Sequence, residues 1–242
     1  MFSSTTRGVA AAAGLALATA SLAACSPSSS AHGLAVVATT TQICDYVTQI
    51  AAKSADISLD KTDAAGKSSH VGAQKDGAAL TMSLTCLLAP NASAHEHEMT
   101  PAQTSALAQA DVMAVSGVDL EHFLDDAVVS SGFKGRMVVT SGVLTAADID
   151  NPGTPDPEGA YTIDRGSERV DVAPWPFPPE EAGEEPEFRF DPHVWTSPKG
   201  ARVQVANLGA GLAAAAPDAA SSINAATASY LEEIDALDQW TA

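Results

Sequence analysis

The stretch DVMAVSGVDLEHFLDDAVVSSGFKGRMVVTSG, residues 111–142, decides the fold class of this chain. It opens with an apolar, β-rich run (DVMAVSG, 111–117) and closes with a second one (RMVVTSG, 136–142). Between the two runs, apolar residues recur at helical spacing, at Leu120, Phe123, Leu124, Ala127 and Val128. A strand, a helix and a second strand in this order predict two parallel strands covered by a helix.

The same alternation continues on both sides of this stretch. Apolar runs predict strands at Leu34–Thr41 and Leu84–Ala89, and helical patterns follow them over 43–50 and 101–109. Towards the C-terminus two more helices are expected, lined by Val205, Leu208 and Leu212 and by Ile223, Tyr230, Ile234 and Leu237, with Pro217 and Asp218 between them. The sequence therefore predicts a single α/β lobe with a parallel sheet of about four strands flanked by helices.

Two segments interrupt the pattern. Residues 52–80 are polar and predict either a loop insertion or a weak hairpin within a lobe that spans 34–143. Residues 144–187 hold eight of the 14 prolines and 12 of the 30 acidic residues, which predicts a long and mostly irregular acidic loop. Such a loop is either a solvated insertion or functional. The remainder, 188–242, carries a histidine motif and the two C-terminal helices.

The strongly negative charge of the chain indicates which binding partners are not expected. The chain has 242 residues and a formal net charge of −18, from 12 Lys and Arg against 30 Asp and Glu. Such a surface repels nucleic acid phosphates and anionic lipid headgroups, so neither is an expected partner. After the N-terminal region, no segment has the ~18 consecutive apolar residues that a transmembrane helix needs.

The N-terminus has the pattern of an export signal. Arg7 precedes an apolar run from Val9 to Leu22, and the run ends in Leu22-Ala23-Ala24-Cys25. Small residues directly before a cysteine resemble a bacterial lipobox, in which Cys25 is acylated and becomes the new N-terminus. We expect a signal peptide over 1–24 and a flexible, lipid-anchored tether over 25–33, and an anchor of two acyl chains would hold the protein stably. A plain secretory signal with a chance cysteine is the alternative.

Export would place the other two cysteines, Cys44 and Cys86, in an oxidising compartment. They either form a disulfide or remain two buried free thiols. Two thiols without a second CxxC pair or a close histidine are weak support for a metal site.

Three of the six histidines lie where a ligand site is expected. His95 and His97 follow a predicted strand, and His193 lies in FRFDPHVWTSP, 188–198, between the acidic loop and a helix. In parallel α/β sheets, ligands bind in loops beyond the carboxyl ends of the strands. Neutral imidazole binds zinc and other divalent transition metals, although solvent-exposed loop histidines would fit the same spacing. In an extended loop His95 and His97 point to opposite sides, so only one of them is expected to ligate.

The motifs PNASAHEHEMTPAQ, ADVMAVSGVDLEHFLDDA and DPHVW, in this order and together with the lipobox, resemble one known family. This family is the cluster A-I solute-binding lipoproteins, the metal receptors of bacterial zinc and manganese ABC importers. The resemblance covers about 34–51 and 84–242. It implies that His95 is one metal ligand, that His97 takes the position of an aromatic residue, and that His193 is the second ligand. Glu121 matches an acid that the resemblance does not place among the ligands.

The resemblance also implies a permease partner, a metal cargo and a second lobe that this sequence lacks. The partner would be an ABC permease, and the cargo zinc, or manganese or iron, with two histidines favouring zinc. The helix ending in LEEIDALDQW resembles the long helix that leads to the second lobe of these receptors, which supplies the other ligands. We therefore expect either a working receptor or a truncated remnant, with weakened binding in which water or an acid such as Glu96 or Glu98 completes the coordination.

The expected function is thus capture of a divalent metal by a monomeric lipoprotein on the outer face of the cytoplasmic membrane. The first alternative is a surface adhesin or interaction module that keeps the lobe without transport. A zinc hydrolase using His95 and His193 is the enzyme alternative, but the sequence has no nucleophile with an adjacent base, no phosphate loop and no HExxH pair. We therefore expect no catalytic activity.

Overall fold

A computed structural model describes residues 33–151, 159–179 and 183–242 of the chain, together with Met1. The fold centres on a seven-stranded sheet with the strand order β3-β2-β4-β1-β5-β6-β7. The strands are β1 (Leu34–Ala38), β2 (Ile57–Thr62), β3 (Ser68–Gly72), β4 (Leu80–Cys86), β5 (Val112–Val115), β6 (Arg136–Val139) and β7 (Thr162–Asp164). All neighbouring strands are parallel except β2 and β3, which form an antiparallel hairpin.

The expected α/β class and the largely parallel sheet are therefore confirmed, but the expected number of about four strands is wrong. Two of the three extra strands, β2 and β3, come from the polar segment 52–80, so the hairpin alternative for this segment is correct. Ile57 and Leu59 alternate with polar residues and are fully buried, whereas β3 lies at the sheet edge and is mostly exposed. The third extra strand, β7, has three residues and pairs with β6 inside the segment 144–187.

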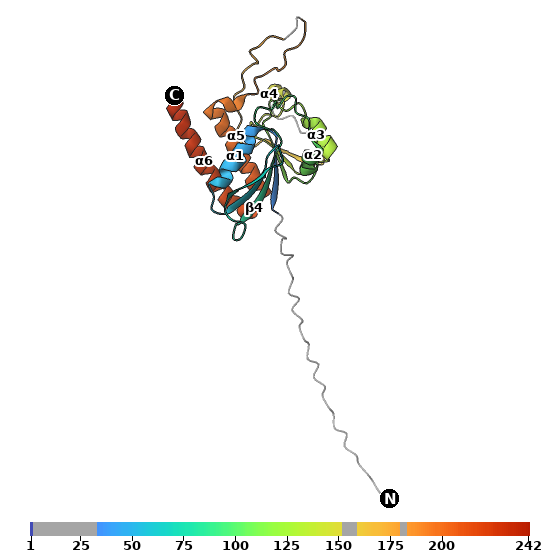
Figure 1. Cartoon of the computed structure of the whole chain (residues 1–242), viewed down its shortest axis with the longest axis vertical. Helices are drawn as coiled ribbons and strands as arrows, with labels where there is room; N and C mark the ends of the chain where they lie inside the picture. The colour runs from blue at the N-terminus through green and yellow to red at the C-terminus, as the bar shows by residue number, and fades with distance from the viewer. Residues whose placement is uncertain (2–32, 152–158, 180–182) are drawn as a thin grey trace. The chain divides into compact units, whose positions relative to one another are not determined.

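Helices cover both faces of the sheet (Figure 1). They are α1 (Thr41–Ala52), α2 (Pro101–Ala108), α3 (Leu124–Ser131), α4 (Ala146–Asp150), α5 (Pro198–Ala215) and α6 (Ala220–Thr241), with short 3-10 turns η1 (Val194–Thr196) and η2 (Pro217–Ala219). Helices α1, α5 and α6 pack on one face, and α2 and α3 pack on the other. Several helix starts follow from local sequence: Thr40, Thr100 and Ser197 cap α1, α2 and α5 with their hydroxyls.

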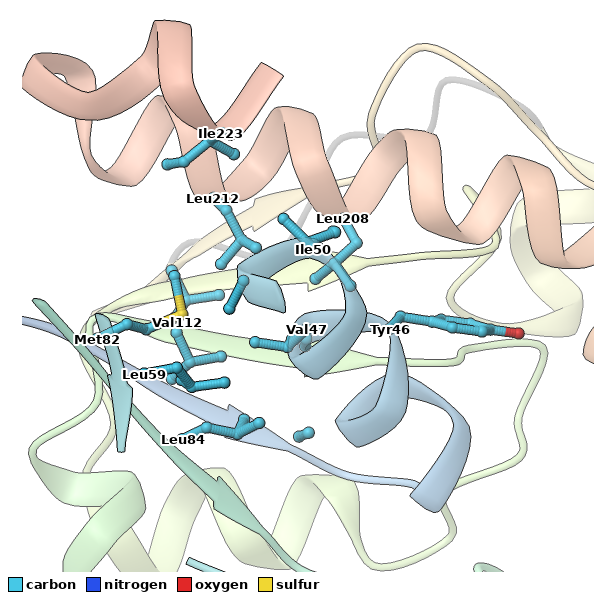
Figure 2. Close-up of a cluster of buried hydrophobic side chains, with 14 of the residues drawn as sticks. Tyr46, Val47, Ile50, Leu59, Met82, Leu84, Val112, Leu208, Leu212 and Ile223 are labelled. Atoms are coloured by element: carbon cyan, nitrogen blue, oxygen red, sulfur yellow. The ribbon is translucent and has the colours of Figure 1, made fainter. Parts of the chain in front are cut away.

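The largest of the three core clusters lies under α1, α5 and α6. Figure 2 shows Leu208 and Leu212 of α5 and Ile223 of α6 directed towards α1 and the strands. These three side chains are completely buried. Because burial of apolar surface is the main favourable term in folding, this cluster fixes α5 and α6 against the sheet. It also fixes the position at which α5 begins, directly after the DPHVW motif.

A disulfide joins Cys44 on α1 to Cys86 at the end of β4, with the two Cα atoms 5.6 Å apart. The bond closes a loop between residues 42 positions apart, which in the chain-entropy model contributes about 4 kcal/mol to stability. It also ties the start of the loop that carries His95 to α1.

The expected signal peptide (1–24) and the acylation site Cys25 lie outside the described residues. Within the described ranges, no helix is both long enough and apolar enough to cross a membrane.

Candidate metal centre

His95 lies in the loop between β4 and α2, at the carboxyl edge of the sheet. Its Nδ1 atom is 3.2 Å from the carbonyl oxygen of Leu120, in the turn that follows β5. A carbonyl oxygen only accepts hydrogen bonds, so Nδ1 must carry the proton. The other ring nitrogen, Nε2, is then left with its lone pair free.

His193 is oriented in the same way by its own motif. Oδ1 of Asp191 accepts a hydrogen bond from the backbone N–H of His193 at 3.0 Å and lies 2.8 Å from Nδ1 of the same residue. The carboxylate thus fixes the ring and places the proton on Nδ1, while Pro192 between them is buried. A histidine held through Nδ1 by a carboxylate is a common arrangement in metal sites, because it presents Nε2 to the ion.

The structure brings His95 and His193 together. Their ring centroids are 5.8 Å apart and the rings meet edge to face. With both Nδ1 atoms occupied, the two Nε2 atoms are the nitrogens available to a shared ligand. A cavity of about 330 Å³ adjoins His193 and is also lined by Asp191, Val194 and Lys199.

Aromatic side chains surround the two histidines. Phe188 is buried, and its ring lies 4.8 Å from that of His95. Trp175 stacks on His193 at 5.9 Å, and Trp195 approaches the same ring at 5.3 Å. Trp175 reaches this position because residues 173–175 pair with 189–191 in a short antiparallel bridge. Part of the segment 144–187 therefore folds back onto the histidine motif and partly covers His193, whose side chain remains 36% exposed.

The partial burial of His95 changes its acid–base behaviour. Burial lowers the pKa of His95 from its ordinary value of 6.5, and the positive charges that His122 and His193 can carry act in the same direction. The hydrogen bond to Leu120 and the negative charge of Glu187 oppose the lowering of this pKa. The net result favours neutral imidazole, which is the form that binds metals.

Sequence reasoning missed several of these neighbours. The ring of His122 lies 5.7 Å from His95, with Phe188 next to both. Trp175, Phe188 and Glu187 come from the acidic segment or its border, where no periodic pattern indicated contacts. The only available signal for His122 was its place directly after Glu121, in the loop beyond β5.

The other residues of the His95 loop are not part of this pair, and His97 was not expected to be a ligand. His97 packs edge to face against Phe123 at 4.9 Å, and burial lowers its pKa. Glu96 and Glu98 are exposed, and neither joins His95 and His193 in a ligand set. Within the described parts of the chain, no group of three or more His, Cys, Asp or Glu side chains has the spacing to hold a metal ion. The candidate metal centre is thus a pair of histidines.

Comparison with known proteins gives related folds. The family model for the periplasmic component A of the zinc-uptake complex, ZnuA, matches residues 77–242. Zn(II)-bound AdcA from Streptococcus pneumoniae has a TM-score of 0.53 at 18% identity, with 86% of this chain and 32% of AdcA covered. The metal-dependent lipoprotein YcdH from Bacillus subtilis has a TM-score of 0.51 at 18% identity, with 86% and 54% covered. A zinc-bound ZnuA deletion mutant has a TM-score of 0.53 at 16% identity, with 86% and 56% covered.

At these identities the solved structures show a shared fold. The chain spans about a third of the length of AdcA and just over half of the length of the other two proteins. The family model covers more than half of this chain, and its match includes both His95 and His193. The chain therefore belongs to the ZnuA family.

Proposed function

We propose that this protein binds a divalent transition metal outside the cytoplasm and serves an ABC importer as its metal receptor. The observation that carries the proposal is the pair of histidines. His95 and His193 come from loops 98 positions apart in the sequence, yet both are held through Nδ1, and none of the described residues hydrogen-bonds to either Nε2 atom. A structural role would not require the same nitrogen to be free in both rings. Family membership supports the same function.

Zinc is the proposed metal, with manganese or iron as alternatives. Imidazole nitrogen suits zinc, whereas manganese favours carboxylate and water oxygens. Zinc prefers four ligands, and the histidine pair supplies two. Water, or groups outside the described residues, would fill the other positions. We therefore expect this chain alone to bind zinc with micromolar affinity or weaker.

The binding test uses calorimetry with zinc on the full chain. His95→Ala and His193→Ala should each weaken binding by about tenfold or more, because each removes one of two protein ligands. His70→Ala is the matched control, since His70 lies on β3 and bonds instead to Asp60 and Ala73. Unchanged zinc binding in the double variant of His95 and His193 would refute the assignment. Nanomolar binding by the parent would show that further residues complete the site.

We also propose that the chain is processed to Cys25 and anchored there by lipid, with residues 25–33 as the tether between the membrane and β1. The pattern Leu22-Ala23-Ala24-Cys25 supports this step. Mass spectrometry of the protein from bacterial membranes should find an acylated Cys25 at the N-terminus. Cys25→Ala should leave the protein unprocessed or released into the medium. An unacylated mature N-terminus at another residue would rule out the anchor.

A further inference from the structure

The turn after β5 has an unusual backbone. Three consecutive residues have positive φ angles: Gly117 at 85°, Val118 at 58° and Asp119 at 55°. This region is costly for residues with a Cβ atom, and most of all for a β-branched residue such as valine. At Gly117 a Cβ atom would lie 2.1 Å from the carbonyl oxygen of Val143, so only glycine fits there. Strained turns of this kind persist only where the surroundings hold them, and they concentrate at functional sites.

The side chain of Glu121 holds the start of this turn. Its Oε1 atom accepts hydrogen bonds from the backbone N–H of Ser116 at 2.6 Å and from the hydroxyl of Thr39 at 2.6 Å. Its Oε2 atom accepts a hydrogen bond from the N–H of Gly117 at 3.0 Å. Thr39 follows β1, which lies between β4 and β5 in the sheet. The Glu121 carboxylate therefore links Thr39, at the end of β1, to the turn that follows β5.

Burying the side chain of Glu121 at this position costs free energy. It is 6% exposed, and in the described residues no lysine or arginine forms an ion pair with it. Burying a carboxylate without an opposite charge is unfavourable, and here only neutral donors offset the cost. An apolar side chain would fill this buried position at a lower cost in free energy. The presence of a glutamate is therefore better explained by a role of the turn that it holds.

The turn presents one backbone group to the metal centre. Leu120 is the residue directly before Glu121, and its carbonyl oxygen faces Nδ1 of His95 at 3.2 Å. The Leu120 side chain is 1% exposed, and its N–H donates to the carbonyl of Gly117 at 3.2 Å. The opposite side of the turn is held by Val118, whose N–H donates to Val143 at 2.8 Å. The carbonyl of Leu120 is thus fixed from both sides.

We propose that Glu121 is a positioning residue of the metal centre: by fixing the 116–121 turn, it holds the Leu120 carbonyl on Nδ1 of His95 and so leaves Nε2 free for the metal. This inference rests on the proposed metal-binding function. His193 receives its orientation from Asp191 directly, whereas His95 receives it from a backbone carbonyl that a buried carboxylate keeps in place. Loss of such supporting groups in metal sites typically weakens binding by about 10–100-fold.

The test is Glu121→Gln in the full chain. Glutamine has nearly the same shape, but its NH2 group must face one of the three donors that the carboxylate now accepts. We expect zinc binding to weaken by about tenfold or more. We also expect 15N NMR of the metal-free protein to show His95 as the Nδ1–H tautomer in the parent and as a mixture of tautomers in the variant. Thr39→Val, which removes one donor, should shift both readouts in the same direction by less.

Ile50→Val is the control for a general loss of stability. Ile50 is buried in the core cluster under α1, α5 and α6, which includes no residue of the 116–121 turn, so this variant destabilises the fold without touching the turn. It should keep the parent tautomer and the parent affinity. Glu121 is merely structural if Glu121→Gln lowers the melting temperature but leaves the His95 tautomer and the zinc affinity within twofold of the parent. Should Glu121→Gln fail to fold, an unchanged tautomer in Thr39→Val overturns the proposal. A parent that binds no zinc would overturn the metal function, while the tautomer measurement still decides the role of Glu121.

Discussion

At the scale of single residues, the ring of Phe188 contributes to the burial that lowers the pKa of His95. Burial is the main reason that the pKa of His95 falls below 6.5, and the buried ring of Phe188 lies 4.8 Å from the imidazole. Phe188→Ala should admit water and move this pKa back towards 6.5. Trp240→Ala is the control, because Trp240 is an exposed aromatic residue near the C-terminal end of α6. NMR titration of the metal-free chain measures both variants.

The lowered pKa of His95 also makes the stability of the fold depend on pH. A histidine whose pKa is lowered in the folded state stabilises the fold at pH above its unfolded value of ~6.5, and this contribution is lost as the pH falls through the folded pKa. The pKa of His97 is lowered by burial as well, so both histidines act in the same direction. A His95 midpoint at or above 6.5 in the parent would contradict the role given to burial.

At the scale of elements, the parts that sequence predicted are those with strong apolar patterns. Strands β1, β4, β5 and β6 and the two C-terminal helices were each marked by an apolar run or stripe. Strands β2, β3 and β7 were not marked by such a pattern. Strand β2 is polar on alternate residues, β3 lies exposed at an edge of the sheet, and β7 is only three residues long. Their positions depend on pairing with distant strands, which no local pattern specifies.

The same limit applies to the candidate site. His95, His97 and His193 could be singled out because they flank elements that the sequence predicts, at the edge of a parallel sheet where ligands bind. The choice of His95 and His193 as the ligand pair came from the resemblance to the receptor family. Trp175 could not, because its place on His193 depends on a backbone bridge between two irregular segments. The importance of Glu121 was also hidden, since a glutamate in a loop is normally solvated. Only its burial and its three hydrogen bonds show that it holds the turn.

At the scale of the whole molecule, metal binding should be visible as a change in thermal stability. A ligand that binds only the folded state stabilises it by RT ln(1 + [L]/Kd), which is about 2.7 kcal/mol when the ligand is at 100 times Kd. For a Kd near ~1 μM, 100 μM zinc should therefore raise the melting temperature of a chain of this size by roughly 5–10 °C. Thermal unfolding of the full chain at increasing zinc concentrations measures this shift.

The excess of acidic residues requires a control, because 30 carboxylates can attract any divalent cation to the folded and unfolded chain alike. Magnesium and calcium prefer oxygen ligands, so they should reproduce a carboxylate effect but not one that depends on two imidazoles. The double variant His95→Ala, His193→Ala should lose the zinc shift and keep any response to magnesium. If magnesium raises the melting temperature of the parent as much as zinc does, the stabilisation comes from surface charge and the histidine pair is not the binding site. If instead the full zinc shift is already present at ~1 μM zinc, the affinity is far tighter than two histidines can supply, and other groups of the chain must join them around the ion.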